Sequence, residues 1–367
     1  MADFQEQYSL LDRLLHRFAF KTTKMQLGLA DNESEEHRVQ LNNIQIDKPV
    51  FITSLPRSGT TILLDVLSKT EQFSYHRYQD MPFIFTPLMW AKFSRNFAKS
   101  NELTERAHKD GIKINQQSPE AFEEMLFKAF WPKWYDGASL PLWPEIANPE
   151  FDRFFADHIK KLLFRDGKGR DGKGRDGKDI RYISKNNLNI TRLPYLKKLF
   201  PQCILLVPFR TPLQHALSLL RQHQNFTELH SQSQFAKDYM AAVGHFDFGA
   251  NLKPVNFSSW FDNTVYQPDS LDFWLEYWIV AYQHIVDNHK SFCHFVCFET
   301  LSTEPQNSFI TLAEVLAIEP QTLIKSVGVI KVAKTHAVDV AALNAENVAK
   351  AQGLYRDMVG IAVNGSC

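Results

Sequence analysis

The residues best suited to chemistry lie in one short stretch, Ser54-Leu-Pro-Arg57-Ser58-Gly59-Thr60-Thr61. The apolar run 49–53 precedes it, and apolar residues at helical spacing follow it. A strand, a tight turn and a helix N-terminus make the layout of a phosphate-binding loop, because the first N–H groups of a helix have no partner within it and point at an anion. The stretch therefore predicts an anion site.

The loop departs from the nucleotide-triphosphate pattern G-x-x-x-x-G-K-[ST]. Ser54 stands at the first glycine, Gly59 at the second and Thr60 at the lysine, and the cation is Arg57 instead. Triphosphate enzymes also need a downstream Asp for Mg²⁺, and no predicted strand ends in an obvious one. Arg57 on the turn suits a charge beside a bridging oxygen better than a triphosphate tail with its metal.

A second group of polar residues follows the apolar run 203–207. Arg210 comes directly after this predicted strand, and Ser218 lies about two turns into the helix that Thr211-Pro212 opens. Open α/β sheets bind ligands at the carboxyl ends of their strands, and an arginine with a hydroxyl could hold a second phosphate there. Taken singly, each residue could equally be an exposed arginine or a serine that packs between helices.

Strands that alternate with helices position these residues. We predict strands over 49–53, 179–184, 203–207 and 292–298, and helices over 60–69, 191–200, 269–288 and 305–317, with another from 212. The run 203–207 is almost wholly apolar, as in a buried parallel strand. The alternation predicts an α/β fold with three layers, in which helices flank a mainly parallel sheet.

The remaining segments are expected to cover this sheet. Residues 1–47 form a helical segment that begins with an amphipathic helix over 5–18, and residues 48–367 form one domain. Within it, residues 70–140 make a helical excursion over the mouth of the sheet, including a helix over 119–130 capped by Ser118. Residues 165–179 are three near-identical pentapeptides, Arg-Asp-Gly-Lys-Gly, which predict a mobile surface loop without chemistry of its own.

Composition narrows the function classes. The chain has 367 residues and a formal net charge of zero, so no global field attracts nucleic acid or acidic membranes. No apolar run approaches the ~18 residues of a membrane span, and no secretory signal is recognisable, which favours a cytoplasmic protein. The four cysteines make no disulfide framework, and Cys293 and Cys297 are expected to be packed thiols rather than metal ligands. No metal site is predicted.

Taken together, the two groups resemble a known family. The loop Ser54–Thr61 looks like the 5′-phosphosulfate-binding loop of sulfotransferases, and Phe209-Arg210 through Ser218 looks like their 3′-phosphate motif, in the same order and spacing. Lys185-Asn-Asn-Leu-Asn-Ile-Thr resembles the segment that connects them. The arginine in the loop is similar to that of the bacterial-type and tyrosylprotein branches. The resemblance covers about residues 48–318.

The resemblance implies a reaction and a set of roles. The family transfers a sulfuryl group in line from 3′-phosphoadenosine 5′-phosphosulfate (PAPS) to a hydroxyl or amine and leaves adenosine 3′,5′-bisphosphate, without a metal. Arg57 would contact the phosphosulfate, and Lys185 would be a second cation near the sulfuryl group. Arg210 and Ser218 would hold the 3′-phosphate. Further N–H and hydroxyl donors would come from four loop residues, Ser58, Gly59, Thr60 and Thr61.

The family also implies a general base, which no motif identifies here. Asp80 is our first candidate, because the segment after the loop helix supplies the base in the carboxylate branch, although Asp80 could instead cap the turn before Pro82. His76 is second, followed by Glu123 or Glu124. The C-terminal Arg-Lys-Gly element of cytosolic members has only a partial counterpart in three residues, Lys350, Gly353 and Arg356.

Two other functions remain open at this point. A small-molecule kinase with a phosphate-binding loop would bind ATP with Mg²⁺, and a catalytically idle nucleotide-binding protein would keep the loop without the reaction. Aromatic segments at 81–97, 122–135 and 246–278 suggest an apolar cleft for a small-molecule, lipid or carbohydrate acceptor. The sequence predicts no nucleic-acid partner, and it predicts neither the acceptor nor the oligomeric state.

Overall fold

The fold is organised around a sheet of five parallel strands in the order β2–β5–β1–β6–β7. Their bounds are Phe73–Ser74 (β2), Arg181–Lys185 (β5), Val50–Ile52 (β1), Ile204–Phe209 (β6) and Cys293–Cys297 (β7). Thr104–Glu105 (β3) and Lys113–Ile114 (β4) form a separate antiparallel pair. The computed structural model describes residues 10–94, 104–105, 113–114, 117–144, 146–167, 180–332 and 335–365.

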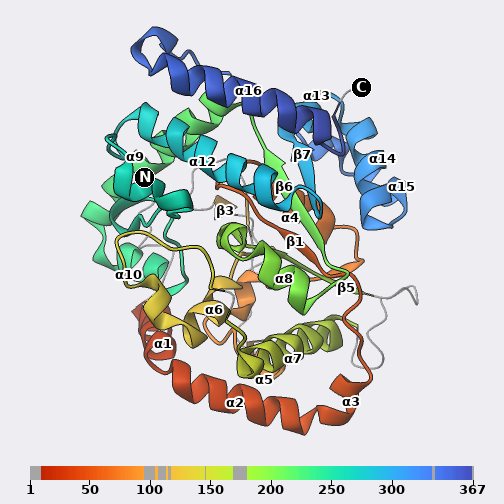
Figure 1. Ribbon diagram of the computed structural model, residues 1–367. Helices are drawn as coiled ribbons and strands as arrows, with labels where there is room; N and C mark the ends of the chain where they lie inside the picture. The colour runs from red at the N-terminus through yellow and green to blue at the C-terminus, as the bar shows by residue number, and fades with distance from the viewer. Residues whose placement is uncertain are drawn as a thin grey trace.

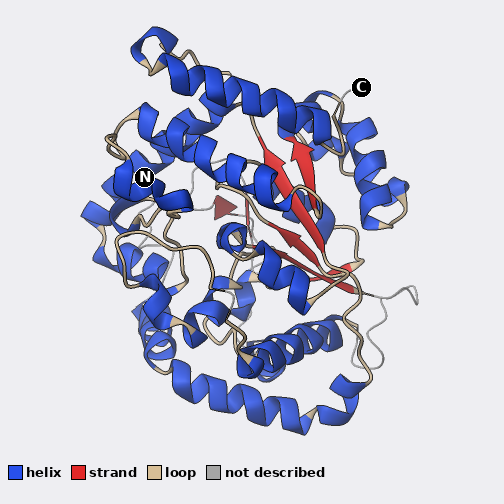
Figure 2. Ribbon diagram, viewed as in Figure 1, coloured by secondary structure: helices blue, strands red, loops and turns tan. Residues whose placement is uncertain are grey.

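Side chains alternate between two hydrophobic cores, one on each face of the sheet. Val50 and Ile52 lie in one core, whereas Phe51 between them lies in the other. Leu206 and Leu205 on β6 divide in the same way. Because successive side chains of a strand point to opposite faces, strands that are apolar throughout require helices on both sides. Figure 2 shows the strands between two sets of helices.

The smaller core is covered by helices from two parts of the chain. They are α4 (Thr60–Ser68), α13 (Phe298–Thr303), α14 (Pro305–Leu316) and α15 (Pro320–Ile324). The larger core is covered by α6 (Glu124–Phe130), α7 (Pro149–Asp166), α8 (Leu193–Leu199), α9 (Pro212–Gln232), α10 (Gln234–Ala242), α12 (Leu271–His289) and α16 (Ala345–Ile361). The predicted three-layer α/β fold with a parallel sheet is confirmed.

The N-terminal helices lie at the outer side of the larger core. They are α1 (Leu10–Lys21), α2 (Thr23–Glu36) and α3 (Arg38–Asn42), and Figure 1 shows α2 beside α5 (Pro87–Ser94) and α7. Lys161 on α7 joins α7 to α2, since its Nζ lies 3.3 Å from Glu33 Oε2 and donates to the Ala30 carbonyl at 2.6 Å. Both charged side chains are almost fully buried. A short helix, α11 (Trp260–Asn263), precedes α12.

One predicted helix begins later than expected. We predicted a helix over 119–130 with Ser118 as its cap, but α6 begins only at Glu124. The Ser118 carbonyl instead accepts a hydrogen bond from the Tyr78 N–H at 3.1 Å, and Glu120 N–H donates to the His76 carbonyl at 2.9 Å. Residues 118–120 are thus held extended against 76–78, and this long-range pairing overrides the local helix-start signal.

The repeat segment also differs from its prediction at its first two residues. Arg165 and Asp166 belong to the last turn of α7, and both side chains are only 8% exposed. They make buried ion pairs, so the expected surface loop cannot begin at residue 165. Residues 168–179 of the same prediction lie outside the described residues.

Candidate functional site

The loop after β1 has the predicted strand–turn–helix layout. β1 ends at Ile52, and α4 begins at Thr60 with Gly59 as its N-cap residue at φ 101°. A Cβ atom on Gly59 would lie 2.6 Å from Cδ2 of Phe298, so only glycine combines this backbone conformation with this contact. Arg57 also has a positive φ, 71°. Loop residues 58–61 therefore lie at the N-terminus of α4, where N–H groups are available to an anion.

Buried hydrogen bonds hold the loop from below. Ser54 Oγ and the Tyr282 hydroxyl lie 2.7 Å apart, and that hydroxyl also donates to the Pro208 carbonyl at 3.3 Å. His215 Nε2 lies 2.7 Å from the Pro56 carbonyl oxygen. Burial lowers the pKa of His215 to about 3, so its ring is neutral at pH 7 and donates this bond as a neutral N–H. No sequence pattern predicts this role for Tyr282 or His215.

The structure brings Arg57, Arg210 and Ser218 together. Arg57 Nε donates to Ser218 Oγ at 3.4 Å, and Arg210 Nη1 donates to the Arg57 carbonyl at 3.2 Å. The Arg210 guanidinium also lies over the ring of Phe298, 5.3 Å from its centroid. Burial lowers the pKa of Arg210, and the neighbouring Arg57 lowers it further, whereas Glu299 raises it. Two cations held at strand and loop ends favour an anionic ligand.

Glu299 organises the far side of this group, although the sequence reading did not single it out. Its Oε1 accepts bonds from the Thr211 N–H at 3.1 Å and the Thr211 hydroxyl at 3.2 Å. Its Oε2 accepts from the Tyr355 hydroxyl at 3.2 Å. Its position in the sequence could have identified it as a site residue, because Glu299 lies just after β7 as Arg210 lies just after β6.

Lys185 lies at the same edge of the sheet as the loop. It is the last residue of β5 and is paired in register with Ile52, the last residue of β1. Two residues further on, the Asn187 carbonyl accepts from Thr53 Oγ1 at 3.1 Å. The parallel register therefore places the Lys185 segment beside the start of the phosphate-binding loop.

Glu123 and Glu124 lie beneath this segment and are fully engaged. Glu123 accepts from Asn189 Nδ2 at 2.7 Å and from the Tyr182 hydroxyl at 2.8 Å. Its side chain is buried, and burial raises its pKa. Glu124 accepts from Asn186 Nδ2 at 2.7 Å and from Arg192 at 2.8 Å. These contacts fix the short helix Asn187–Thr191 (η4), so both glutamates position the segment that follows Lys185.

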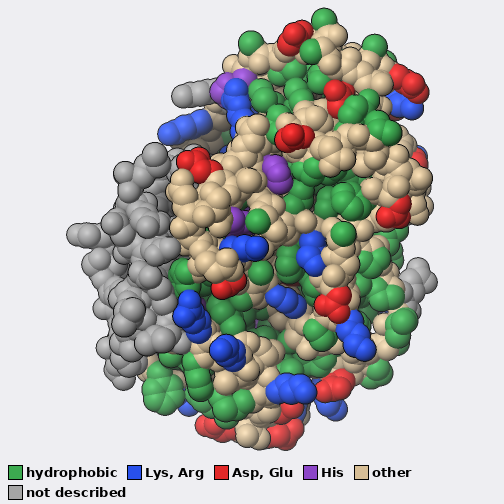
Figure 3. All heavy atoms as spheres, turned by 90° about the vertical axis from the view of Figure 1, so that its left-hand side faces the viewer, with side chains coloured by type: hydrophobic (Ala, Val, Ile, Leu, Met, Phe, Trp, Pro, Cys, Tyr) green, Lys and Arg blue, Asp and Glu red, His purple; other side chains and the backbone are tan. Residues whose placement is uncertain are grey.

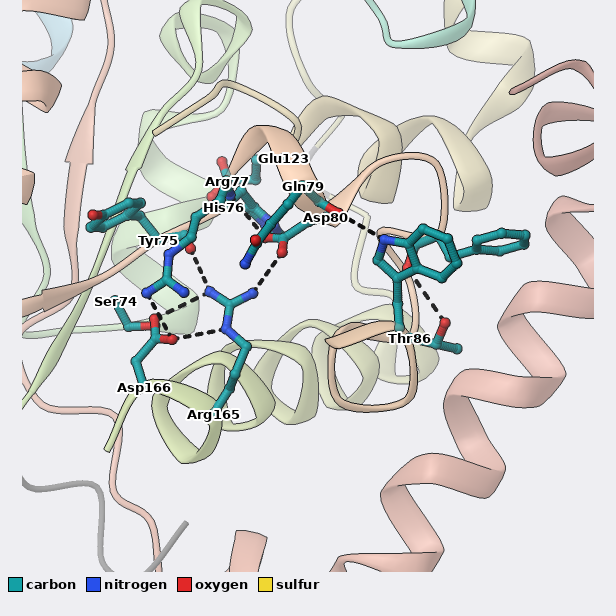
Figure 4. Close-up of polar contacts among 12 residues, drawn as sticks. Ser74, Tyr75, His76, Arg77, Gln79, Asp80, Thr86, Glu123, Arg165 and Asp166 are labelled. Carbon is teal, nitrogen blue, oxygen red and sulfur yellow. Dashed lines mark hydrogen bonds and ion pairs between the residues drawn. The ribbon is translucent and has the colours of Figure 1, made fainter. Parts of the chain in front are cut away.

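Asp80 is part of a buried ion network between β2 and the end of α7 (Figure 4). Arg165 Nη1 donates to Asp80 Oδ1 at 2.8 Å, and the Arg77 N–H donates to Asp80 Oδ2 at 2.8 Å. Arg165 also pairs with Asp166, whose other contacts are Arg77 at 2.9 Å and the Ser74 hydroxyl at 2.7 Å. Asp80 itself is 4% exposed. Its carboxylate is thus already satisfied by a cation and a backbone donor.

His76 lies next to this network and is sealed from solvent. Its ring stacks on His158 at a centroid distance of 5.1 Å, and its Nδ1 lies 3.9 Å from Asp80 Oδ2, beyond hydrogen-bond reach. Burial lowers the pKa of His76 to about 4 and that of His158 well below its ordinary value. The two rings are neutral and packed, and His76 is only 2% exposed.

The three residues that form the partial counterpart of the C-terminal Arg-Lys-Gly element all lie on α16. Lys350 pairs with Glu346 one turn away at 2.7 Å, and Arg356 is exposed. A different segment reaches the first turn of α9, near Arg210. His336 N–H donates to Gln214 Oε1 and Gln214 Nε2 donates to the His336 carbonyl, both at 2.8 Å.

The predicted aromatic segments contribute largely to the core. Phe122, Phe127, Trp274 and Trp278 are all below 5% exposed. Part of the 81–97 segment lies outside the described residues. The face shown in Figure 3 carries basic, acidic and hydrophobic side chains intermixed. Within the described ranges, no cluster of His, Cys, Asp and Glu could hold a metal ion, and no helix is long and apolar enough to cross a membrane.

Comparison with known proteins gives one strong match. The model of the sulfotransferase family matches residues 49–254, more than half of the chain. No curated protein matches this chain. The similar crystal structures include two mycobacterial proteins. Sulfotransferase STF1 from Mycobacterium tuberculosis H37Rv has 14% identity and a TM-score of 0.47, over 88% of this chain and 80% of that one. Sulfotransferase STF9 from Mycobacterium avium has 11% identity and a TM-score of 0.47, over 93% of this chain and 83% of that one. The matched range 49–254 contains both the phosphate-binding loop and the Arg210–Ser218 group.

Proposed function

Because this chain belongs to the sulfotransferase family, we propose that it transfers a sulfuryl group from PAPS to a hydroxyl or amine of a small-molecule acceptor. The observation that carries the proposal is the contact among Arg57, Arg210 and Ser218 beside the N-terminus of α4. It concentrates positive charge and donors where open α/β sheets bind ligands.

The residues divide between the two anionic ends of the donor. Arg57 with Ser58, Gly59, Thr60 and Thr61 would bind the 5′-phosphosulfate through the guanidinium, N–H groups and hydroxyls. Arg210 and Ser218 would bind the 3′-phosphate. This division is supported by their elements: the first group lies on the turn into α4, whereas the second lies on the end of β6 and on α9.

Catalysis would be mainly positioning and electrostatic stabilisation. PAPS supplies an activated sulfuryl group on a phosphate leaving group. Arg57 would stabilise the negative charge that grows on the bridging oxygen, and Lys185 would stabilise the transferring group from β5. Tyr282, His215 and Glu299 would keep these cations in place through the loop and the first turn of α9.

The first experiment is a titration of the purified protein with adenosine 3′,5′-bisphosphate, with and without EDTA. We expect binding that is independent of metal. The variant Arg210→Ala should bind about 10- to 150-fold more weakly, because a hydrogen bond to a charged group contributes ~1.5–3 kcal/mol. Lys350→Ala is the control, since Lys350 is exposed on α16 and pairs only with Glu346 among the contacts described.

The second experiment is a screen of acceptors with labelled PAPS, including phenols, lipids and sugars. Binding of ATP with Mg²⁺ in preference to the bisphosphate would point to a kinase. An idle nucleotide-binding protein would bind the bisphosphate but would neither sulfate any acceptor in the screen nor release sulfate slowly to water. Either result would refute the proposed activity.

A further inference from the structure

A histidine–aspartate pair lies in the segment between α10 and the short helix Gly249–Asn251 (η5). Nε2 of His245 is 3.7 Å from Oδ2 of Asp247, and the two side chains are 19% and 14% exposed. They are therefore sheltered without being sealed, unlike Asp80 and His76. At this distance the carboxylate does not hydrogen-bond to the ring, but it would stabilise a positive charge on the nitrogen that takes up a proton during a reaction.

The pair is fixed to the segment that directly follows Lys185. Asn187 Nδ2 donates to Asp247 Oδ2 at 3.2 Å, and the Asn187 carbonyl accepts from Thr53 Oγ1 at 3.1 Å. One residue thus connects Asp247 with the start of the phosphate-binding loop. His245 lies one further contact away.

The first residue of the 244–247 segment, Gly244, packs closely against the side chain of Glu124. Gly244 has φ 81°, and a Cβ atom there would lie 2.6 Å from Cγ of Glu124. Glu124 in turn accepts from Asn186, the neighbour of Lys185. One end of the 244–247 segment therefore packs on Glu124, a partner of Asn186, and the other end is bonded to Asn187. Both ends are thus tied to the segment that follows Lys185.

The surroundings of His245 suit a neutral ring that can accept a proton. Burial is the main influence and lowers the pKa of His245. Asp247 and Glu120 raise it, and Lys185 lowers it. His230 on α9 also lies within electrostatic range, and the ring of Phe226 stacks on His245 at a centroid distance of 5.3 Å. At neutral pH the ring is uncharged, and Asp247 would stabilise the imidazolium once it forms.

We propose that His245 is the general base of this enzyme and that Asp247 stabilises its protonated form. The inference rests on the proposed function. The acceptor oxygen forms a bond to sulfur while the bond from sulfur to the bridging phosphate oxygen breaks, and that oxygen keeps the electron pair. The acceptor proton moves to Nε2 of His245, and adenosine 3′,5′-bisphosphate leaves. Asp80, His76, Glu123 and Glu124 then serve to build the site.

The test compares His245→Gln and His245→Ala with wild type, using the acceptor found in the screen. We expect kcat to fall about 10²- to 10⁴-fold, with bisphosphate affinity within about twofold of wild type. The acidic limb of the kcat/KM–pH profile should disappear, and added imidazole should restore part of the activity of His245→Ala. His230→Gln is the matched control from the same cluster and should keep kcat and the acidic limb.

Asp247→Asn tests whether the carboxylate stabilises the protonated ring. It should lower kcat less than His245→Gln, and the acidic limb should move to lower pH, because a neutral amide no longer stabilises the imidazolium.

Two outcomes would overturn the assignment. His245→Gln with wild-type kcat would exclude the base role. A loss of kcat with no imidazole rescue and with equally weakened bisphosphate binding would show a structural role. If wild type itself neither binds the bisphosphate nor transfers sulfate, the proposed function fails instead, which is a distinguishable result.

Discussion

Arg57 and Arg210 hold two positive charges close together, and this arrangement is costly until an anion is bound. Like charges repel, and burial of Arg210 adds to the cost of its charge, as the lowered pKa of Arg210 indicates. A phosphate ligand would relieve both. In the proposed site, recognition would therefore depend on a few contacts rather than on a large charged surface.

The proposed contact between Ser218 and the 3′-phosphate can be tested by removing the hydroxyl oxygen of Ser218. Ser218→Ala removes the acceptor for Arg57 Nε and the proposed donor to the 3′-phosphate. We expect the dissociation constant for adenosine 3′,5′-bisphosphate to rise about tenfold or more, since hydrogen bonds to charged groups contribute ~1.5–3 kcal/mol. Calorimetric titration measures it. An unchanged constant would mean that the 3′-phosphate binds elsewhere.

Tyr282→Phe tests the support below the loop. It leaves Ser54 Oγ, which is fully buried, without its partner at 2.7 Å. The free energy of unfolding should fall by about 1–3 kcal/mol, the cost of an unsatisfied buried polar group. Ser54→Ala combined with Tyr282→Phe should cost less than the sum of the two single changes. Urea denaturation gives all three values, and simple additivity would contradict the coupling.

At the scale of elements, the junction between β2 and α7 depends on the buried ion network around Arg165. Asp80→Asn leaves Arg165 with weaker compensation in a site that is only 8% exposed, so unfolding free energy should fall by ~3–5 kcal/mol. Asp65→Asn, which breaks the more exposed pair with Lys69, is the control and should cost about 0.5 kcal/mol. A folded Asp80→Asn protein that has lost only the acidic limb of its pH profile would instead identify Asp80 as the base.

The repeat segment gives a second prediction at this scale. Deleting residues 170–174 should change the free energy of unfolding by less than ~1 kcal/mol, because loop-closure entropy varies slowly with length. Arg165→Ala, by contrast, should be strongly destabilising because Asp80 and Asp166 would both lose a buried partner. Thermal unfolding compares them. A deletion as damaging as Arg165→Ala would show that the segment packs on the core.

Local pattern was enough to predict most elements and the loop, because these signals are short-range. The strand over 203–207 corresponds to β6, and the expected start near Ser270 is the N-cap of α12. The sequence pattern could not predict contacts between segments that are far apart in the chain. Ser118 looked like a helix cap but pairs with Tyr78, and Tyr282 reaches Ser54 across 228 positions. The choice of a general base is limited in the same way: Asp80 was predicted from its place in the sequence, whereas the proposal of His245 rests on burial and on partners that the pattern does not give.

At the scale of the whole molecule, buried neutral histidines make stability depend on pH. The folded-state pKa is about 4 for His76 and about 3 for His215, against an ordinary value near 6.5. The unfolded chain therefore binds more protons below pH 6.5. Their contribution is fully present above that pH and is lost as pH falls toward 4, by up to about 1.4 kcal/mol per pH unit for each ring.

Urea unfolding at pH 7.5, 6.0 and 5.0 measures this slope. His76→Phe should flatten it, because the new ring keeps the stacking on His158 and cannot take up a proton in the unfolded chain. Equal slopes for the variant and wild type would show that other groups control the acid sensitivity.

The position of Arg165 and Asp166 has a consequence for how this gene can change. The pair is the first dipeptide of three near-identical units, so removing the first unit or the second produces the same protein sequence. Slippage during replication, which adds or removes whole units, would therefore always return an Arg-Asp pair to the end of α7. A change in the number of units would therefore alter the length of the segment and leave the ion network at its start unchanged.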